Sequence, residues 1–231
     1  GLSQSLQIHA RHIDCDVLTR QAWQQLRADH SLVALHACGQ LHMTLLEQAV
    51  TAGCRQIALS PCCYNRIESA TYRPLSPAAQ QSGLELSRDD LGIPLQSTHT
   101  AGLRTRRLRD RSMAWRLTFD LWQREVRGEN SYLPTPSRPE SAVQGGIARH
   151  HGLPLASSAQ WAALEPLGWQ RLAEVRNLEL VTGLFRRPLE VWLLLDRAMY
   201  LQESGYDVQL GLFAPAHLTP RNFLLIAEEK N

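Results

Sequence analysis

Two runs of small and apolar residues lie near the start of the chain. Residues 32–38 read Leu-Val-Ala-Leu-His-Ala-Cys, and residues 56–61 read Gln-Ile-Ala-Leu-Ser-Pro. Such runs are typical of strands that are buried on both faces of a parallel sheet. Between them, residues 42–52 carry apolar side chains at helical spacing and end before Gly53. A strand, a helix and a strand joined by short links predict a βαβ unit.

The pattern before this unit predicts one more strand and one more helix. Residues 7–14 alternate apolar and polar side chains, which is typical of a strand. Residues 19–30 follow as a predicted helix with Thr19 as its N-cap.

The end of the chain returns to the same alternation of helix and strand. Pro188 is placed to open an amphipathic helix over 189–204. Residues 207–214 and 222–229 then predict two strands. The loop between them is too short for a crossover, so the two strands are expected to be antiparallel.

The middle of the chain is different. It contains a Ser-x-x-Asp helix-start pattern at 87–91, a long Arg-rich helix over 101–127, a Pro- and Ser-rich loop over 130–142 and a helical pattern over 157–176. We therefore expect residues 1–66 and 187–231 to form an α/β core, and residues 67–186 to form a helical, Arg-rich insertion or cap.

Composition narrows the class of protein. The chain has 231 residues, of which 44% are hydrophobic and 20% charged. These values exclude a disordered tail, a collagen-like repeat and a polyelectrolyte. No apolar run approaches the ~20 residues of a membrane span, and the first residues do not read as a signal peptide. Five cysteines without disulfide-framework spacing favour a reducing cytoplasm, where we expect the protein to act.

The candidate chemistry lies where the two apolar runs end. The first ends in His36, Ala37, Cys38 and Gly39, and the second in Ser60, Pro61, Cys62, Cys63 and Tyr64. Ligands bind beyond the carboxyl ends of parallel strands, so these side chains are expected to converge on one crevice. The side chains of Asp14 and Asp16 are expected to lie at the same edge of the sheet.

The thiols at this edge have three interpretations. One histidine and three cysteines are suitable Zn²⁺ ligands, although their spacing matches no zinc finger or ribbon. Alternatively, His36 and Cys38 form a base and nucleophile pair on one strand face. The third interpretation is that the thiols fill a tight corner of the core, and we predict no resident metal.

The stretch "LHACG", a helix and then "IALSPCCYN" resembles a group of S-adenosylmethionine-dependent methyltransferases with His-x-Cys-Gly and Pro-Cys-Cys-Tyr strand ends. It is distantly similar to tRNA 2′-O-methyltransferases that modify the acceptor stem. The closing "GYDVQLGLFAPAHLTPRNFLLIAEE" resembles the reversed final hairpin of class I methyltransferases. The resemblance covers about 7–66 and 187–230. It implies a Rossmann-like α/β fold with a mostly parallel sheet, an antiparallel last strand and a helical insertion.

The resemblance also implies roles for these residues. Those expected to bind S-adenosylmethionine are Asp14, Cys15, Asp16, His36, Ala37, Cys38 and Gly39. Those expected to take part in catalysis are His36, Cys62, Cys63 and Tyr64, with His36 the best candidate for a base. Ser60, Pro61 and Tyr64 are expected to hold the substrate, with Tyr64 stacking on a flat target. For the acidic residues, capping of the following helix is an alternative role.

One part of the resemblance is missing. No Gly-x-Gly pattern occurs before residue 32, so the Gly-rich loop that would hold the methionine and ribose has no counterpart in this sequence. Both a fragment and a degenerate protein fit this observation. If the chain is complete, the sheet is expected to have an uncovered edge or to need a partner.

The Arg-rich stretch favours RNA as a partner. Five arginines fall within residues 104–111, and of these Arg104, Arg106 and Arg107 are predicted to bind substrate. A solvated basic face is the alternative, and the net charge of +2 argues neither for nor against nucleic acid. We therefore predict a methyltransferase that acts on RNA, with tRNA as a candidate substrate. The alternative function is a non-catalytic nucleic-acid-binding or assembly protein, and the oligomeric state stays open.

Overall fold

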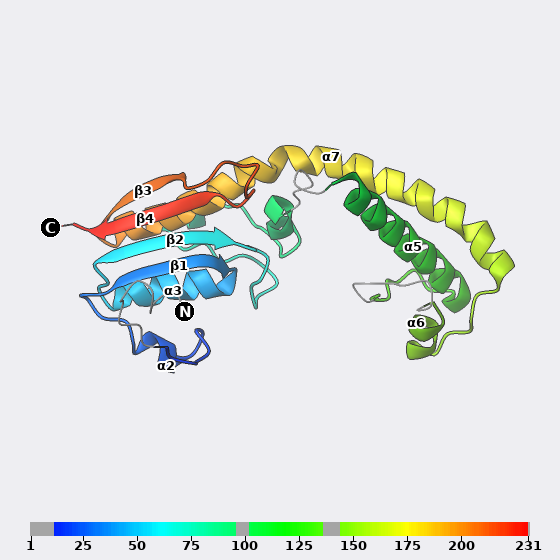
Figure 1. Cartoon of the computed structure of the whole chain (residues 1–231), viewed down its shortest axis with the longest axis horizontal. Coiled ribbons are helices and arrows are strands. Elements are labelled where there is room, and N and C mark those ends of the chain that lie inside the picture. The colour runs from blue at the N-terminus through cyan, green and yellow to red at the C-terminus, as the bar shows by residue number, and fades with distance from the viewer. Residues whose placement is uncertain (1–11, 96–101, 136–143, 231) are drawn as a thin grey trace. The chain divides into compact units, whose positions relative to one another are not determined.

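The computed structural model describes residues 12–95, 102–135 and 144–230 (Figure 1). The chain divides into two compact units, each described by itself. The first, called the core unit, comprises Gly1–Ser97 and Arg186–Asn231. The second, called the helical unit, comprises Thr98–Phe185.

The core unit contains the described strands. Its elements, in chain order, are α2 (Arg20–Trp23), β1 (Ser31–Cys38), α3 (Gln40–Thr51), β2 (Gln56–Cys62), α4 (Pro77–Gln81), the 3₁₀ helix η1 (Asp90–Leu95), the last part of α7 (Ser158–Glu203), β3 (Tyr206–Leu212) and β4 (Phe223–Glu229).

The strands form one mixed sheet in the order β1-β2-β4-β3. β1 and β2 are parallel and are joined through α3, so the predicted βαβ unit is confirmed. β4 is antiparallel to both of its neighbours, which confirms the antiparallel last strand. The expected α/β fold with a helical insertion is therefore present, although the described sheet has a single parallel pair.

The hydrophobic core lies on one face of this sheet. Ile57, Leu59 and Leu225 are fully buried there, against Leu46 of α3 and Leu201 of α7. Side chains alternate between the faces of a strand, so the intervening residues point to the other side.

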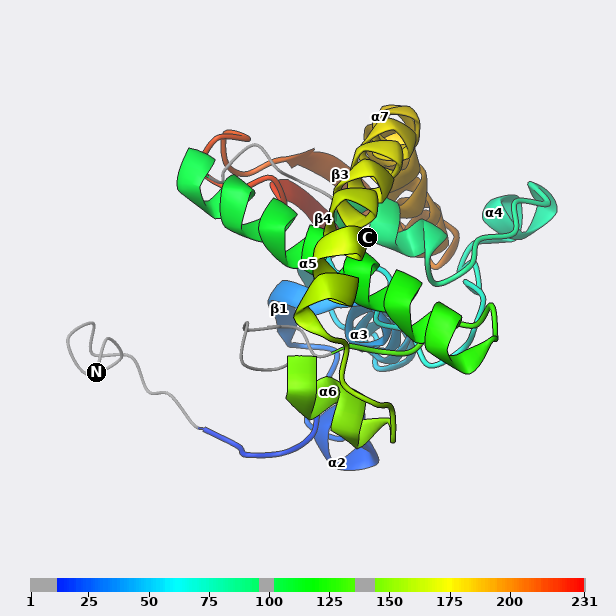
Figure 2. The same ribbon diagram turned by 90° about the vertical axis from the view of Figure 1, so that its right-hand side faces the viewer.

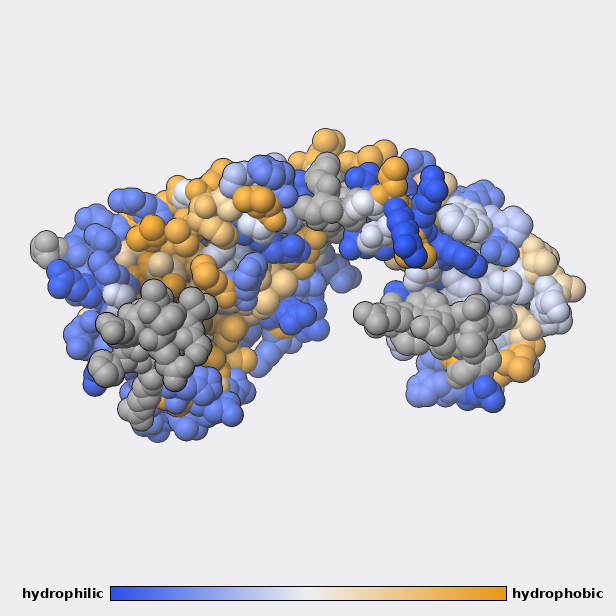
Figure 3. Space-filling model, viewed as in Figure 1, coloured by the Kyte–Doolittle hydropathy of each residue, from blue (hydrophilic) through white to orange (hydrophobic). Residues whose placement is uncertain are grey.

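The opposite face of the sheet is exposed along β1. Val33 and Leu35 of β1 are 66% and 65% exposed, and apolar residues are visible over the sheet in Figure 3. The prediction that the first strand is buried on both faces is therefore wrong. β1 also ends the strand order, so it is an edge strand of the sheet in the described part of the chain.

The N-terminal elements differ from their predictions. Residues 12–14 have no regular structure, and the rest of the strand expected over 7–14 lies outside the described residues. The helix expected over 19–30 is limited to Arg20–Trp23. The Thr19 side chain makes no cap hydrogen bond to this helix and donates to the Asp16 carbonyl at 2.6 Å.

The two helices predicted over 157–176 and 189–204 form one continuous helix, α7. Pro188 lies inside it and opens no new helix. An interior proline costs about 3 kcal/mol because it lacks an N–H and crowds the preceding turn. Burial of Leu193, Leu194 and Leu201 after the proline offsets this cost.

The boundary of the insertion also differs from the expectation. Residues 67–97 lie in the core unit and not in the helical unit. Tyr72, Leu86 and Leu91 of this segment are buried with Leu193 of α7. The predicted helix start at Ser87 is confirmed as a local motif, because Ser87 N donates to Asp90 Oδ2 at 2.8 Å and Asp90 N donates to Ser87 Oγ at 3.2 Å.

The helical unit contains α5 (Leu103–Arg127), α6 (Gln144–His150) and the first part of α7, and Figure 2 shows α5 and α7 crossing. Phe119, Trp122 and Ile147 form its core, with Trp115 stacked on Phe119. Of the loop expected over 130–142, residues 130–135 have no regular structure and the rest lies outside the described residues. None of the described helices is long and apolar enough to cross a membrane.

Candidate functional site

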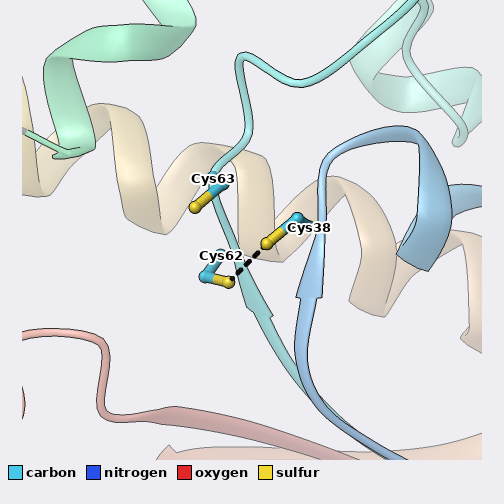
Figure 4. A group of neighbouring side chains, drawn as sticks. All are labelled: Cys38, Cys62 and Cys63. Carbon is cyan, nitrogen blue, oxygen red and sulfur yellow. Dashed lines mark hydrogen bonds between the residues drawn. The ribbon is translucent and has the colours of Figure 1, made fainter. Parts of the chain in front are cut away.

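Three cysteine side chains converge where β1 and β2 end. Cys38 is the last residue of β1 and pairs in register with Cys62, the last residue of β2, while Cys63 follows directly. The Sγ atoms of Cys38 and Cys62 are 3.4 Å apart, and all three Sγ atoms lie within 4.8 Å of one another (Figure 4). The predicted convergence is therefore confirmed for these thiols.

Backbone irregularities shape both strand ends. The register of β1 against β2 shifts between Leu35 and Ala37, so His36 is a bulged residue without a partner. His36 and Cys63 have positive φ angles of 55° and 46°. Such left-handed conformations are costly for residues other than glycine and cluster at functional sites.

The bulge separates His36 from the thiols. Its side chain is exposed and is not a member of the three-cysteine group. Cys38 Sγ donates to the His36 carbonyl oxygen at 3.3 Å, and no hydrogen bond joins the His36 ring to Cys38 in the described part of the chain. The expectation that both side chains share a strand face fails because the bulge interrupts the alternation of side chains.

Gly39 connects this edge to α3. Its φ of 49° and ψ of −119° suit glycine, and an added Cβ would lie 2.0 Å from the Arg66 carbonyl oxygen. Gly39 N donates to the Cys62 carbonyl, and Gln40 N donates to the Arg66 carbonyl at 2.7 Å. The backbone of Arg66 therefore takes up the space beside Gly39, one of the residues expected to bind S-adenosylmethionine.

A buried polar network lies behind the strand ends. His42 and Arg197 are both buried, and Arg197 Nε donates to His42 Nε2 at 2.8 Å. His42 Nδ1 is 3.0 Å from the Ala37 carbonyl oxygen. Burial and the nearby Arg197 charge hold the pKa of His42 well below its usual 6.5, so the ring is neutral.

Tyr72 and Asp196 extend this network. Arg197 Nη1 donates to the Tyr72 hydroxyl, which donates to Asp196 Oδ2 at 2.5 Å. Asp196 Oδ1 also accepts from the backbone N–H and hydroxyl of Ser76. The network therefore ties residues 72–76 and the end of β1 to α7.

The predicted substrate-holding residues of the second strand are buried. Ser60 and Tyr64 are each 2% exposed, and Pro61 is also buried. The Tyr64 ring packs edge-on against His42, and Arg197 lies 5.2 Å from its centre. Burial raises the pKa of Tyr64, so its hydroxyl stays protonated. The ring is therefore placed in the core and not on a surface where a substrate could stack.

The predicted cofactor-binding residues are distributed unevenly. Ala37 is 3% exposed and belongs to the core. Asp14 and Asp16 are exposed, with Cys15 half-buried between them. Asp16 Oδ1 accepts a hydrogen bond from Leu18 N at 2.9 Å, which makes a local turn before α2 and does not cap that helix, since Leu18 precedes its first residue Arg20.

A charged group lies where β4 begins. Because β4 is antiparallel to β2, its start lies toward the carboxyl end of β2. Arg187 forms an ion pair with the buried Glu190 at 2.7 Å and stacks on the Phe223 ring. Burial raises the pKa of Glu190.

The helical unit carries the predicted arginine surface. The side chains of Arg104, Arg106, Arg107, Arg109 and Arg111 on α5 are exposed. Asp110, between them in sequence, forms an ion pair with Arg176 of α7 at 2.5 Å. Arg124 and Arg127 at the end of α5 bind Asp120 and Gln123 of the same helix. The exposed arginines therefore gather in the first half of α5.

Sequence reasoning missed the buried network around His42. A signal was present, since Arg197 lies four residues after Leu193 and four before Leu201, on the apolar stripe of the predicted helix. A charged residue on such a stripe indicates a buried polar partner. Glu190 lies in the same predicted helix and Arg187 lies just before it. Nothing in the sequence pattern marked either residue as part of a site.

Comparison with known proteins bears on the first part of the chain. No solved structure matches the chain. Residues 2–70 match a family model described as a methyltransferase domain. The matched segment contains β1, α3 and β2 and thus both cysteine-bearing strand ends. This match supports a methyltransferase-family assignment for this part of the chain.

Proposed function

We propose that this chain acts as an S-adenosylmethionine-dependent methyltransferase with RNA as its substrate. The observation that carries the proposal is the match of residues 2–70 to a methyltransferase domain. The sheet supports it, because a βαβ unit followed by a hairpin with an antiparallel last strand is what the resemblance to class I methyltransferases implies.

The reaction belongs at the carboxyl edge of β1 and β2, where open α/β sheets bind ligands. Residues present there and before α2 fit part of the cofactor: the exposed carboxylate of Asp14 can accept a hydrogen bond from an adenine amino group. Ala37 and Gly39 contribute backbone shape only, since Ala37 is buried and Arg66 fills the space beside Gly39.

S-adenosylmethionine, when bound, supplies a methyl group to a nucleophilic oxygen or nitrogen, and the acceptor then loses a proton. The exposed imidazole of His36 is the group proposed to receive that proton. The bulge that exposes His36 is what makes its ring accessible to a substrate.

The proposal of RNA as substrate rests on α5. Arg104, Arg107 and Arg111 are exposed and, at spacings of three and four residues, share one side of the helix. Asp110 is the acidic residue that interrupts this basic run, and its carboxylate is already paired with Arg176. A surface of guanidinium groups binds phosphate oxygens and releases counterions.

The activity is tested with the purified chain, radiolabelled S-adenosylmethionine and total tRNA. Transfer of label to RNA, lost in His36→Ala and kept in His30→Ala, supports the proposal. His30 is a matched control because it lies just before β1, at the other end of that strand. Label that enters protein in place of RNA, or no binding of S-adenosylmethionine by calorimetry, contradicts it.

RNA binding is tested separately by filter retention. Arg104→Glu with Arg107→Glu is expected to lower retention at least tenfold, because four units of charge change on one helix face. Arg55→Glu with Arg73→Glu changes the charge equally at exposed positions of the core unit and is the control. Equal retention by both variants contradicts a role for α5.

The second candidate function is a non-catalytic RNA-binding protein. It is favoured by the Arg66 carbonyl, which occupies the space beside Gly39. Retention of RNA by α5 without calorimetric binding of S-adenosylmethionine is the result that identifies it.

A further inference from the structure

We propose that Cys38, Cys62 and Cys63 form a metal site that binds one Zn²⁺ ion through three thiolates. The inference departs from the sequence-based expectation of no resident metal, and it does not rest on the proposed methyltransferase function. Three observations carry it: the spacing of the sulfur atoms, the rigidity of their backbone and the number of thiols.

The spacing of the sulfur atoms suits a tetrahedral ion. At a Zn–S distance of about 2.3 Å, tetrahedral geometry separates two sulfur ligands by roughly 3.8 Å. Cys38 Sγ and Cys62 Sγ are 3.4 Å apart, and the third Sγ lies within 4.8 Å of both. Small rotations of the side chains are therefore enough to place an ion among the three sulfur atoms.

The backbone holds the three thiols in place before any ion binds. Cys38 and Cys62 are paired residues of neighbouring strands. Cys63 is held in its left-handed conformation by a turn in which Arg66 N donates to the Cys63 carbonyl at 2.9 Å. A site built on strand ends loses little freedom on binding, which favours affinity.

The pattern of burial leaves one position of the ion open. Cys62 is 3% exposed, whereas Cys38 and Cys63 are half-buried at the edge of the sheet (Figure 4). An ion held by these sulfur atoms would keep its fourth position toward the outer side of the edge, where a water molecule or a ligand could bind. Three protein ligands and one open position are typical of reactive zinc sites.

The third thiol distinguishes this group from a pair poised for a disulfide. A disulfide between Cys38 and Cys62 would use two sulfur atoms and leave Cys63 without a function in the cluster. Thiolates select Zn²⁺ and similar soft ions over Mg²⁺ and Ca²⁺, so the cluster itself indicates the class of metal.

The test uses the full chain, purified with a reducing agent, stripped of metal and titrated with Zn²⁺ or Co²⁺. We expect one equivalent to bind. The Co²⁺ form is expected to show intense sulfur-to-metal charge-transfer absorption and tetrahedral d–d bands. This spectrum reports the ligands without any substitution, so it does not depend on the folding of a variant.

Single substitutions identify the ligands. Cys38→Ser, Cys62→Ser and Cys63→Ser are each expected to weaken Zn²⁺ binding at least tenfold, the loss that even outer partners of a metal can cause. Cys15→Ser is the matched control, because Cys15 is half-buried and lies outside the cluster. Circular dichroism confirms that each variant is folded.

Three results would overturn the proposal. One is no metal binding by a chain in which all five thiols react with Ellman's reagent after denaturation. Another is binding that survives all three cluster substitutions. The third is a chain that reoxidises readily to a Cys38–Cys62 disulfide, detected by peptide mapping, and binds no Zn²⁺ when that disulfide is reduced.

Discussion

The guanidinium of Arg197 donates a hydrogen bond from Nε to Nε2 of His42 at 2.8 Å, and both side chains are buried. Because Nε2 accepts this bond, the proton of the neutral ring is on Nδ1, which donates to the Ala37 carbonyl at 3.0 Å. The residue after Ala37 is Cys38. A contact between α7 and α3 therefore fixes the strand end that carries the candidate site.

His42 predicts a pH dependence of stability. Burial, and then the Arg197 charge, lower the pKa of the folded ring well below 6.5. As the pH falls below 6.5, the unfolded chain binds a proton that the folded chain excludes, so the free energy of unfolding decreases. The loss is up to about 1.4 kcal/mol per pH unit until the folded pKa is reached. Urea unfolding at pH 7.5 and 5.5 measures it.

His42→Gln is the control for this prediction. Glutamine can accept from Arg197 and donate to the Ala37 carbonyl, yet it does not titrate. The difference in unfolding free energy between the two pH values is expected to be about 1 kcal/mol smaller in the variant. An identical difference in both proteins would show that other groups dominate the acid sensitivity.

Asp196 predicts a large loss of stability on substitution. Its carboxylate accepts hydrogen bonds from Tyr72, Leu75 and Ser76, and it lies in a network with the buried charge of Arg197. Asp196→Asn is expected to lower the free energy of unfolding by about 3 kcal/mol. Asp207→Asn, at an exposed carboxylate with a 3.7 Å ion pair to Lys230, is expected to change it by less than about 0.5 kcal/mol.

Position 39 is expected to tolerate no side chain. Gly39→Ala places a Cβ 2.0 Å from the Arg66 carbonyl oxygen in a left-handed conformation, so a loss of at least about 3 kcal/mol is expected. Gly83 has a similar φ of 66° but nothing within 4 Å. Gly83→Ala should therefore cost only about 1 kcal/mol. Thermal unfolding of both variants separates the steric clash from backbone strain.

Alanine substitutions at two glycines of α7 in the helical unit are expected to change stability in opposite directions. A Cβ at Gly168 would lie 2.1 Å from Thr118 Oγ1 of α5, so Gly168→Ala is expected to cost about 1–3 kcal/mol. A Cβ at Gly183 meets nothing within 4 Å, so Gly183→Ala is expected to stabilise the helix by about 0.5–1 kcal/mol. Denaturant unfolding followed by helical circular dichroism measures both. Equal effects would contradict the packing of α5 against α7 at Gly168.

Local pattern was sufficient for much of the fold. The apolar runs before Gly39 and Cys63, the helical stripe between them and the alternation after Gly205 predict β1, α3, β2 and the β3–β4 hairpin close to their observed bounds. These elements follow from residue spacing alone. The match of residues 2–70 to a methyltransferase domain agrees with the family resemblance carried by the same segment.

Local pattern failed where tertiary packing outweighs a local signal. Pro188 is a helix-start residue in isolation, but burial of Leu193 and Leu194 keeps α7 continuous through it. Tyr64 follows a strand end, the position of a ligand-facing residue, but its ring lies in a hydrophobic cluster with Met43 and Tyr72. Neither outcome can be predicted without knowing which helix packs beside the strand.

The sequence by itself predicted which cysteines lie at strand ends, because the length of each strand follows from its apolar run and from the residues that end it. The tertiary structure alone decided that the exposed His36 stays outside the group of Cys38, Cys62 and Cys63, since that depends on a bulge between two paired strands. It also decided the state of His42, because a neutral, buried ring requires Arg197, which is 155 residues away in the chain. Desolvation and long-range hydrogen bonds act between residues that only folding brings together.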